Sequence, residues 1–370
     1  MRAGIRALIT VGLIAVTAAA VSPSTAAAAK APRQFFGIDP QAPLSSADLA
    51  RMRQAGLGTL RIGFSWPAVD PAAPAGGFNW GPTDGIVLDA ARNGMRLLPV
   101  IYGSPSWVAA LDGRTCYPLC ATYAPRSKAA LKAWASFVSG LEDRYGPRGA
   151  FWALHPEVPS VPIRAWQIWN EQNSGQYFTP RPNVPAYARM LHSAAGAIRS
   201  RDRGAEIVLG GMFGQPNNGE VPGYTAAGFL RRLYRVHGIK RRFDTVAIHP
   251  YAASLGGMNR QVQRIRDQLK LSGDRHAQIR ITELGWASGG PPHPLNKGPR
   301  GQARFLRGSF RYFLRHRRGW NVRGVNWFSW RDASGAGLCK WCPESGLFEE
   351  ASGFLAKPAL AALTRITGGS

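Results

Sequence analysis

Trp166-Gln167-Ile168-Trp169-Asn170-Glu171 and Ile279-Arg280-Ile281-Thr282-Glu283 each run from a short apolar stretch into a glutamate. Each pattern predicts a β-strand that ends at a carboxylate, with a helical segment further along the chain. The same strand–helix alternation extends in both directions. We expect eight strands, over Phe35–Asp39, Thr59–Trp66, Arg96–Tyr102, Ile163–Asn170, Glu206–Met212, Thr245–Tyr251, Ile279–Glu283 and Gly324–Trp330.

Amphipathic segments between these strands predict helices over Ser46–Ala55, Ser127–Arg144, Val184–Arg201, Gly228–Val236, Met258–Leu271 and Gln302–Arg315. Strands that alternate with helices pair in parallel, and eight is the number that closes a TIM (β/α)8 barrel. A doubly wound open sheet is the competing fold, but the first turn, Gly37-Ile38-Asp39-Pro40, lacks a Gly-rich phosphate loop. We therefore predict an α/β protein with one barrel domain over residues 30–370.

Residues 1–29 have the pattern of a secretory signal peptide. Arg2 and Arg6 precede an uncharged apolar run from Ala7 to Val21, and small residues follow as far as Ala29. The run is too short to span a bilayer comfortably. We expect cleavage and a secreted protein without a transmembrane span in the mature chain; retention as an N-terminal anchor is the alternative.

The chain carries 46 Lys and Arg against 21 Asp and Glu, a net charge of +25. This excess favours association with polyanions such as an anionic cell-wall polymer, and the alternative is a basic surface without a partner. Predicted helices end in basic segments such as Arg201-Asp202-Arg203-Gly204 and His316-Arg317-Arg318-Gly319. Because helix ends lie opposite the catalytic face of a barrel, we expect much of this charge away from the chemistry. No motif that reads nucleic acid accompanies the charge, so we expect no specific nucleic-acid partner.

The four cysteines form two local couples, Cys116 with Cys120 and Cys339 with Cys342. In an exported protein we expect a disulfide within each couple. A four-cysteine zinc site is the alternative and would need both couples to meet. The spacing of the second couple is also that of a redox motif, but no βαβ context surrounds it. We expect no metal and no cofactor.

Catalytic residues of such a barrel project from the C-terminal ends of the strands. Those ends carry Glu171 and Glu283, although glutamate is scarce in this chain. Two carboxyl groups of different pKa can protonate a glycosidic oxygen and attack an anomeric carbon. Around them lie aromatic and polar side chains of the kind that bind a carbohydrate substrate: Arg61, Trp107, Asn170, His249, Tyr251, Trp286 and Trp330. In the competing interpretation, either glutamate alone caps the next helix and His249 is a core histidine.

Asn170-Glu171 on the fourth strand with Glu283 on the seventh resembles the clan A glycoside hydrolases. Segments such as Phe78-Asn79-Trp80 and Pro105-Ser106-Trp107 resemble the family 39 and family 5 type. The resemblance implies a retaining double displacement, with Glu171 as acid/base, Glu283 as nucleophile and a carboxyl separation of about 5–5.5 Å.

The resemblance also implies roles for the neighbouring side chains. Arg61 lies beside the nucleophile, and its mid-strand charge itself requires a partner such as Glu283. Tyr251 hydrogen-bonds Glu283, Asn170 holds the sugar 2-hydroxyl, and His249 orients the network. Trp330 is expected under the sugar being cleaved, with Trp107, Trp286 and Trp66 as candidates for flanking subsites. The alternative is that these side chains pack in the protein, which for each of the three flanking tryptophans taken alone is the favoured interpretation.

Hydrolysis of a β-linked glycan by a monomer is therefore the leading prediction. Transglycosylation through the same glutamates is one alternative, and non-catalytic binding of a wall polysaccharide is another. We also expect the Cys339–Cys342 turn to hold Trp341 near the substrate, because this turn follows the eighth strand on the catalytic face.

Overall fold

The computed structural model describes residues 1, 31–72, 77–116, 120–215, 223–334, 339–350 and 355–369. The predicted signal peptide falls outside these residues apart from Met1. Residues Met1–Ala31 form a unit of their own, and the unit Pro32–Ser370 contains all the strands and helices below. Among the described helices we find none with the length and apolar character that crossing a bilayer requires.

Eight parallel strands close into a barrel in sequence order, which confirms the predicted TIM barrel and excludes the open sheet. The barrel closes where β1 pairs with β8, with Gly37 opposite Asn326. The strands are β1 (Phe36–Asp39), β2 (Thr59–Ser65), β3 (Arg96–Tyr102), β4 (Ala165–Asn170), β5 (Glu206–Phe213), β6 (Thr245–His249), β7 (Gln278–Ile281) and β8 (Val322–Phe328).

Four predicted strands end earlier than expected. In β2 the difference is Trp66 alone, whereas β6, β7 and β8 each end two residues early, so that Tyr251, Glu283 and Trp330 lie in loops beyond them. In β6 the reason is Pro250, which has no backbone N–H to donate to a neighbouring strand. All three side chains therefore take their direction from loop conformation and not from the strand pleat.

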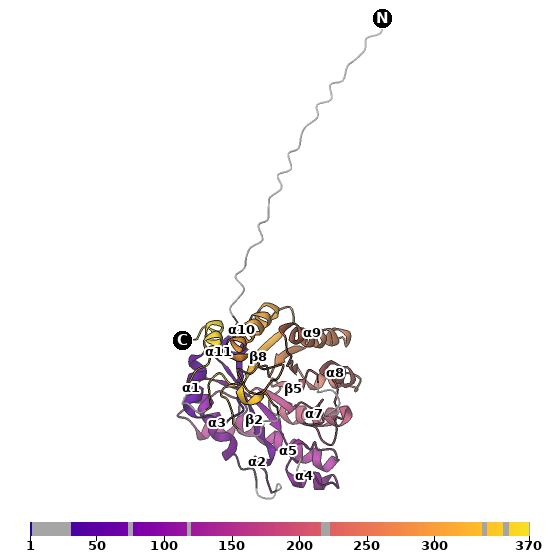
Figure 1. Cartoon of the computed structure of the whole chain (residues 1–370). Helices are drawn as coiled ribbons and strands as arrows, with labels where there is room; N and C mark the ends of the chain where they lie inside the picture. Colours follow the sequence, from indigo (N-terminus) through magenta and orange to yellow (C-terminus); the bar gives the residue numbers. More distant parts are fainter. Residues whose placement is uncertain are drawn as a thin grey trace. The chain divides into compact units, whose positions relative to one another are not determined.

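Helices surround the strands, as Figure 1 shows. All six predicted helices are present, with bounds that differ by a few residues. The sequence interpretation did not place α2, α3, α4, α6 or α11; at α3, Gly81, Pro82 and Gly85 weaken the helical pattern. The helices are α1 (Ser46–Gln54), α2 (Trp66–Val69), α3 (Gly81–Arg92), α4 (Ser106–Leu111), α5 (Lys128–Tyr145), α6 (Ala150–Leu154), α7 (Val184–Arg199), α8 (Ala226–Leu233), α9 (Leu255–Leu271), α10 (Gly298–His316) and α11 (Pro358–Thr367).

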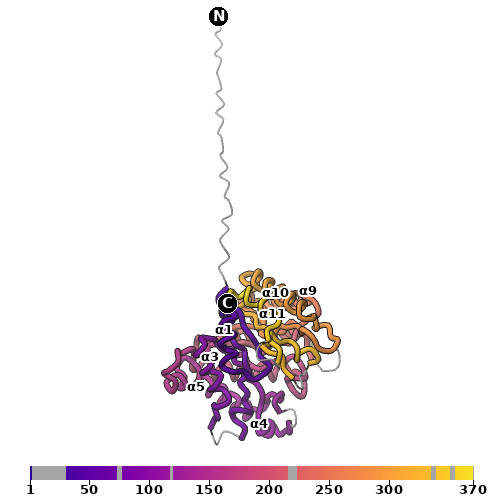
Figure 2. The backbone as a smooth tube through the Cα atoms, turned by 60° about the vertical axis from the view of Figure 1, so that its left-hand side comes forward, coloured from indigo at the N-terminus to yellow at the C-terminus, as the bar shows by residue number. Residues whose placement is uncertain are grey.

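The C-terminal helix α11 completes the outer ring between α10 and α1 (Figure 2). Thr367 at its end donates a hydrogen bond of 2.6 Å to the backbone oxygen of Ala55, just after α1. Gly368 follows in the left-handed conformation that commonly ends a helix. The two ends of the barrel sequence are thereby held together.

The barrel interior is packed with side chains from strands that are not neighbours. Leu98 of β3, Val208 of β5 and Ala247 of β6 are buried in one cluster. Since β3 and β5 are separated by β4, this contact runs through the inside of the barrel. Closer to the strand C-terminal ends the buried side chains become polar, with Asp39, Arg61 and Gln167 among them. An apolar core thus supports a polar layer at the catalytic end.

Candidate active site

Glu171 and Glu283 follow the ends of β4 and β7 and face each other at the end of the barrel. One carboxylate oxygen of each lies within 4.8 Å of the other. Neither residue caps a helix, because α7 begins after Asn183, whose side chain is the cap, and α10 begins at Gly298. The structure thus removes the capping interpretation for both glutamates.

Glu283 accepts two hydrogen bonds from predicted partners. The guanidinium of Arg61 donates to its Oε1 at 2.6 Å, and the Tyr251 hydroxyl donates to its Oε2 at 2.9 Å. One donor on each oxygen fixes the direction in which the carboxylate faces. Both contacts are those expected from the sequence.

Arg61 lies at the centre of a buried polar network. Besides Glu283 it donates to Asp39 at 2.6 Å, to Asn170 Oδ1 at 2.7 Å and to Gln167 at 2.7 Å. Asn170 is therefore held next to the pair by its own amide oxygen, and among the described residues its amide nitrogen has no hydrogen-bond partner. The buried arginine thus donates to four side chains from three strands or strand ends.

Asp39 is a third carboxyl group at the site, and the sequence interpretation did not include it. It is the last residue of β1 and is only 7% exposed. It shares the Nη1 atom of Arg61 with Glu283. The available signal was its position, a carboxylate at the C-terminal end of a predicted strand, the same criterion that identified the two glutamates.

His249 bridges the two glutamates. Its Nδ1 lies 2.8 Å from Glu171 Oε1 and 3.3 Å from Glu283 Oε2, and its Nε2 bonds the Thr282 hydroxyl at 3.0 Å. The imidazole reaches this position because Gly211 of β5 faces it; a Cβ atom there would collide with the ring. His249 is fully buried, as the core interpretation required, and it also belongs to the network, as the functional one required.

Burial and mutual repulsion set the protonation of the site. Burial, followed by the charge of Glu283, raises the pKa of Glu171 well above its ordinary value. Burial also raises the pKa of Asp39 to about 8, although Arg61 acts to lower it. For His249 burial, followed by the charge of Arg61, lowers the pKa well below its ordinary value. One guanidinium thus serves several carboxyl groups, and burial favours the protonated form of Glu171 beside a neutral imidazole.

The backbone around Glu171 is strained. Trp169 and Glu171 have φ angles of 75° and 42°, in the left-handed region that costs non-glycine residues about 1–3 kcal/mol each. The Trp169 indole N–H bonds the Tyr177 carbonyl at 2.7 Å, and the Glu171 N–H bonds the Gly211 carbonyl at 3.0 Å. These contacts hold a conformation that aims the Glu171 carboxyl inward.

Within the described part of the chain, one set of side chains has the composition of a metal site: Glu171, His249 and Glu283. Their ligand atoms lie within 4.8 Å of one another. The same atoms are already bonded among themselves and to Arg61 and Tyr251. These partners account for the charge and hydrogen bonding of the cluster by themselves.

The aromatic predictions need correction. Trp330 cannot be the platform under a sugar in this structure, because it is fully buried and its indole N–H bonds Asp48 at 2.8 Å. Trp286 and Trp66 are also fully buried. The indole N–H of Trp286 bonds the Ala252 carbonyl at 2.8 Å. Trp107 is partly exposed and packs edge-on against Trp66. The indole faces predicted for substrate serve the core instead, except at Trp107.

A different aromatic group flanks the glutamates. Tyr251 packs on Trp341 at a ring separation of 5.0 Å and on Phe328 at 6.4 Å. Trp341 lies in the turn closed by a disulfide between Cys339 and Cys342, and Cys116 pairs with Cys120. Both local pairings are confirmed, and with the described cysteines all bonded the zinc alternative falls. Trp341 is next to the site, as expected, whereas Phe328 was missed.

Removing the charge of Arg61 should destabilise the fold. In Arg61→Met the carboxyl groups of buried Asp39 and partly buried Glu283 lose the one cation that pairs with them among the described residues, and we expect the unfolding free energy in urea to fall by about 3–5 kcal/mol. Arg164→Met is the matched control, because its ion pair with Asp202 involves a side chain that is 54% exposed. That loss should stay below about 1 kcal/mol; equal losses in the two variants would contradict the role of Arg61.

Asp39 should make the stability fall as the pH rises. Its pKa is about 8 in the fold and about 3.9 when unfolded, so the folded state binds the extra proton between these values. The stabilisation is complete at low pH and is lost as the pH approaches about 8. We expect Asp39→Asn, which is neutral throughout, to gain stability relative to the wild type between about pH 5 and about pH 8. Parallel pH profiles in urea denaturation would contradict this.

Opening the Cys339–Cys342 disulfide should impair activity more than stability. So short a loop contributes at most about 2 kcal/mol, whereas Trp341 lies directly against Tyr251. In Cys339→Ser/Cys342→Ser we expect kcat/KM to fall about tenfold or more through misplacement of the Tyr251–Glu283 contact. Cys116→Ser/Cys120→Ser is the control, with a similar change in melting temperature and unchanged kinetics. A large fall in melting temperature with unchanged kinetics in the first variant would contradict the prediction.

Comparison with known proteins finds similar structures at low sequence identity. No family model matches the sequence, and none of the curated proteins matches it. Among solved structures, a family 39 glycoside hydrolase from Bacteroides cellulosilyticus is similar over 91% of this chain and 64% of its own, with a TM-score of 0.62 and 20% identity. A family 39 enzyme from Xanthomonas axonopodis pv. citri matches over 92% and 68%, with a TM-score of 0.67 and 16% identity.

A family 39 β-xylosidase from Caulobacter crescentus is similar over 92% of this chain and 73% of its own, with a TM-score of 0.65 and 17% identity. The chain thus spans between 64% and 73% of the length of these three proteins. At identities this low, structural similarity supports a shared fold only, and the chemistry must be argued from the residues of the site. The chain therefore has the (β/α)8 fold that these family 39 glycoside hydrolases share.

Proposed function

We propose that this protein is a retaining glycoside hydrolase that cleaves β-linked O-glycosidic bonds. The observation that carries the proposal is the glutamate pair at the ends of β4 and β7, with carboxylate oxygens within 4.8 Å. Retaining enzymes hold the two groups about 5–5.5 Å apart, whereas inverting enzymes need about 6.5 Å or more to admit a water. The separation supports a direct attack on the sugar by one of the two carboxylates.

The surroundings of each glutamate support a division of roles. Glu171, buried and with a raised pKa, is suited to protonate the departing oxygen and then to take a proton from water. Glu283, which accepts from Arg61 and Tyr251, is suited to remain charged and attack the anomeric carbon. Asn170 lies beside Glu171 with its amide nitrogen free for a sugar hydroxyl. The two roles are complementary, because Glu283 attacks the anomeric carbon of the same glycosidic bond whose oxygen Glu171 protonates.

The β-linked class of substrate draws support from the similar structures, one of which is a β-xylosidase. Export of the protein draws support from its two disulfides, because such bonds persist in oxidising compartments. We therefore propose that the protein acts on a glycan outside the cell.

The test is the configuration of the first product. We expect release of reducing ends from at least one member of a β-glycan panel, and proton NMR should show that the new end first appears as the β-anomer. Initial appearance of the α-anomer would overturn the retaining mechanism. If wild type and Glu283→Gln were equally inert but both bound the glycan, the protein would be a binding protein.

A further inference from the structure

Three adjoining cavities open at the end of the barrel where the strands begin. The first, of about 430 Å³, is lined by the opening residues of β2 to β5 and by Arg323 near the start of β8. The second, of about 570 Å³, shares Glu206 with the first. The third, of about 410 Å³, shares Arg164 with the first and Arg203 with the second. Because they share lining residues, they form one continuous surface, here called the basic groove.

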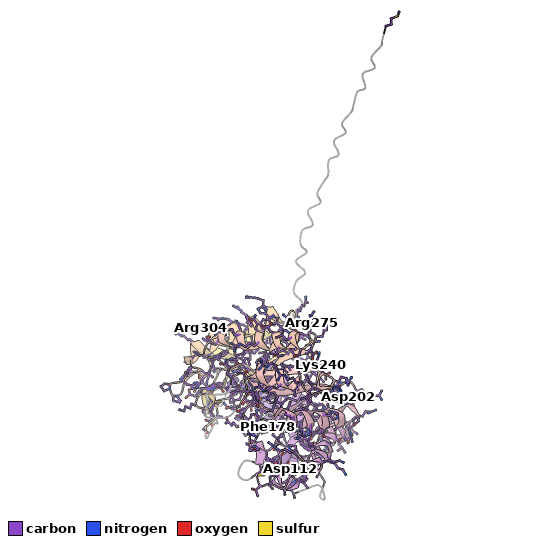
Figure 3. The ribbon with its side chains drawn as sticks, turned by 90° about the vertical axis from the view of Figure 1, so that its right-hand side faces the viewer. Asp112, Phe178, Asp202, Lys240, Arg275 and Arg304 are labelled. Carbon is purple, nitrogen blue, oxygen red and sulfur yellow. A yellow bond between two sulfur atoms is a disulfide. The ribbon has the colours of Figure 1, made fainter. Side chains whose placement is uncertain are left out.

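The basic groove lies at the opposite end of the barrel from the glutamate pair. Arg96, which opens β3, lines the groove, whereas Tyr102 ends that strand on the catalytic side. At about 3.3 Å per residue the strand separates the two ends by about 20 Å. Two residues that line the groove, Lys240 and Asp202, lie on the right in the side view of Figure 3, on the other side of the molecule from Arg304 of α10. A ligand in the groove therefore does not touch the glutamates.

The acidic side chains of the groove are already neutralised. Each forms an ion pair with an arginine of the same surface: Glu206 with Arg280 at 2.8 Å, Asp244 with Arg199 at 2.8 Å and Asp202 with Arg164 at 3.1 Å. The Glu206–Arg280 pair is bidentate. These pairs leave no acidic side chain in the groove to balance its other cations.

Six further basic side chains line the groove and form no ion pair with a carboxylate among the described residues, although Arg323 helps to lower the pKa of Glu206 through its charge. All six are exposed. They are Arg96, Arg148, Arg203, Lys240, Arg241 and Arg323. Unpaired cations held side by side repel one another, and a bound anion relieves that repulsion. The three adjoining cavities of the groove thus offer donors to an extended chain of negative charges.

We propose that the basic groove binds a linear anionic polysaccharide, whose carboxylate or phosphate groups pair with these six side chains. Guanidinium groups donate two parallel hydrogen bonds to either anion, and five of the six side chains are arginines. A thin flexible chain fits cavities that are recessed between strand starts and helix ends. Binding there anchors the protein to an anionic matrix and leaves the catalytic end facing outward.

The lining argues against nucleic acid as the occupant. Its only aromatic residues are Phe35 and Phe243, which are 1% and 4% exposed, so no ring face is free to stack on a base. Single-stranded nucleic acid is normally held by such stacking. Duplex DNA is read by an element that protrudes into its groove, whereas this surface is recessed. Polysaccharide needs neither feature.

The test compares two variants that lose equal charge. Arg96→Gln/Arg203→Gln/Arg323→Gln removes three unpaired cations of the groove, and Arg114→Gln/Arg181→Gln/Arg300→Gln removes three exposed ones from the loops and helix start of the other end. Binding to immobilised polygalacturonate and to a phosphorylated mannan is measured in about 100 mM NaCl, with neutral dextran and a single-stranded oligonucleotide alongside. We expect the wild type to bind at least one of the two anionic polysaccharides. Binding to polygalacturonate would indicate carboxylate groups, and binding to the phosphorylated mannan would indicate phosphate groups.

The groove variant should lose at least about tenfold in affinity and the control variant less than about twofold. Lys240 should also be protected from acetylation by the bound polymer in the unmutated protein, as read by mass spectrometry. Equal losses in both variants, equal binding of dextran, or tighter binding of the oligonucleotide would overturn the proposal. Hydrolysis of a small neutral glycoside should be the same in all three proteins, so failure of the groove and failure of the catalytic proposal are distinguishable.

Discussion

Glu283→Gln is expected to lower kcat/KM on every glycoside by at least about 10⁴-fold. The amide has nearly the same shape as the carboxylate, and its one oxygen can still accept from Arg61 while its NH2 group faces the Tyr251 oxygen. It has no charge with which to attack the anomeric carbon. The measurement is initial rate on an aryl glycoside and on a glycan, with the melting temperature as a check on folding.

Glu157→Gln is the matched control. The Glu157 side chain is 52% exposed and pairs with His155, and it precedes β4, whereas Glu171 and Glu283 follow their strands. It should keep the wild-type rate. Glu283→Gly in the presence of azide gives a sharper test, since the small anion fits the space of the lost carboxylate and should yield the glycosyl azide of inverted configuration. A Glu283→Gln rate within tenfold of the wild type would exclude this residue as the nucleophile.

Glu171→Gln is expected to divide substrates according to their leaving group. On a glycan, whose departing oxygen needs a proton, the rate of glycosylation should fall by about 10²–10⁴-fold. On a dinitrophenyl glycoside, whose leaving group is stable as an anion, the first step should remain within about tenfold of the wild type. Stopped-flow measurement of the dinitrophenolate burst isolates that step.

The pH profile provides the second readout for Glu171. The acid must hold its proton in the free enzyme, and burial raises its pKa well above the ordinary value. The wild-type rate should therefore persist above the range of an exposed glutamate, about pH 4.3, and then fall as Glu171 loses its proton. That alkaline fall should be absent in Glu171→Gln. An unchanged alkaline limb, or equal losses on both substrates, would remove Glu171 from the role of acid.

The fold was predictable because its signal is local and repeated. Each strand contributes a short apolar run, and the run over Arg96–Tyr102 was placed without error. Helix starts follow from neighbours in the sequence, as at Asn183, whose side chain caps α7. The missed helix α3 shows the limit of this signal, since Gly85 in its middle lowers helix propensity while packing still forms the helix.

The candidate site was predictable where one rule applies to it, namely that side chains at strand C-terminal ends converge. Glu171 and Glu283 satisfy that rule, and Arg61 and Tyr251 were found at the contacts expected of them. Asp39 satisfies the same rule and was overlooked. It could have been found by applying the rule to every strand instead of stopping at two carboxylates.

The aromatic residues were not predictable in this way. The orientation of the Trp330 side chain depends on a contact between distant parts of the chain. Its indole turns inward to bond Asp48, which is 282 positions away in the sequence. Phe328 ends β8 and meets Tyr251 from beyond β6, and Trp341 comes beside Tyr251 from the loop after β8. A residue in a loop has no fixed periodicity, so its side chain takes the direction that long-range contacts select.

The sequence by itself determined the number and order of the strands and the position of a glutamate at the end of β4 and just beyond β7, because strand periodicity and residue order are properties of neighbours along the chain. The tertiary structure decided which aromatic rings reach the site, that Asp39 shares Arg61 with Glu283, and that unpaired cations line a groove at the other barrel end. These features depend on distances between residues far apart in sequence, and such distances exist only once the barrel has closed.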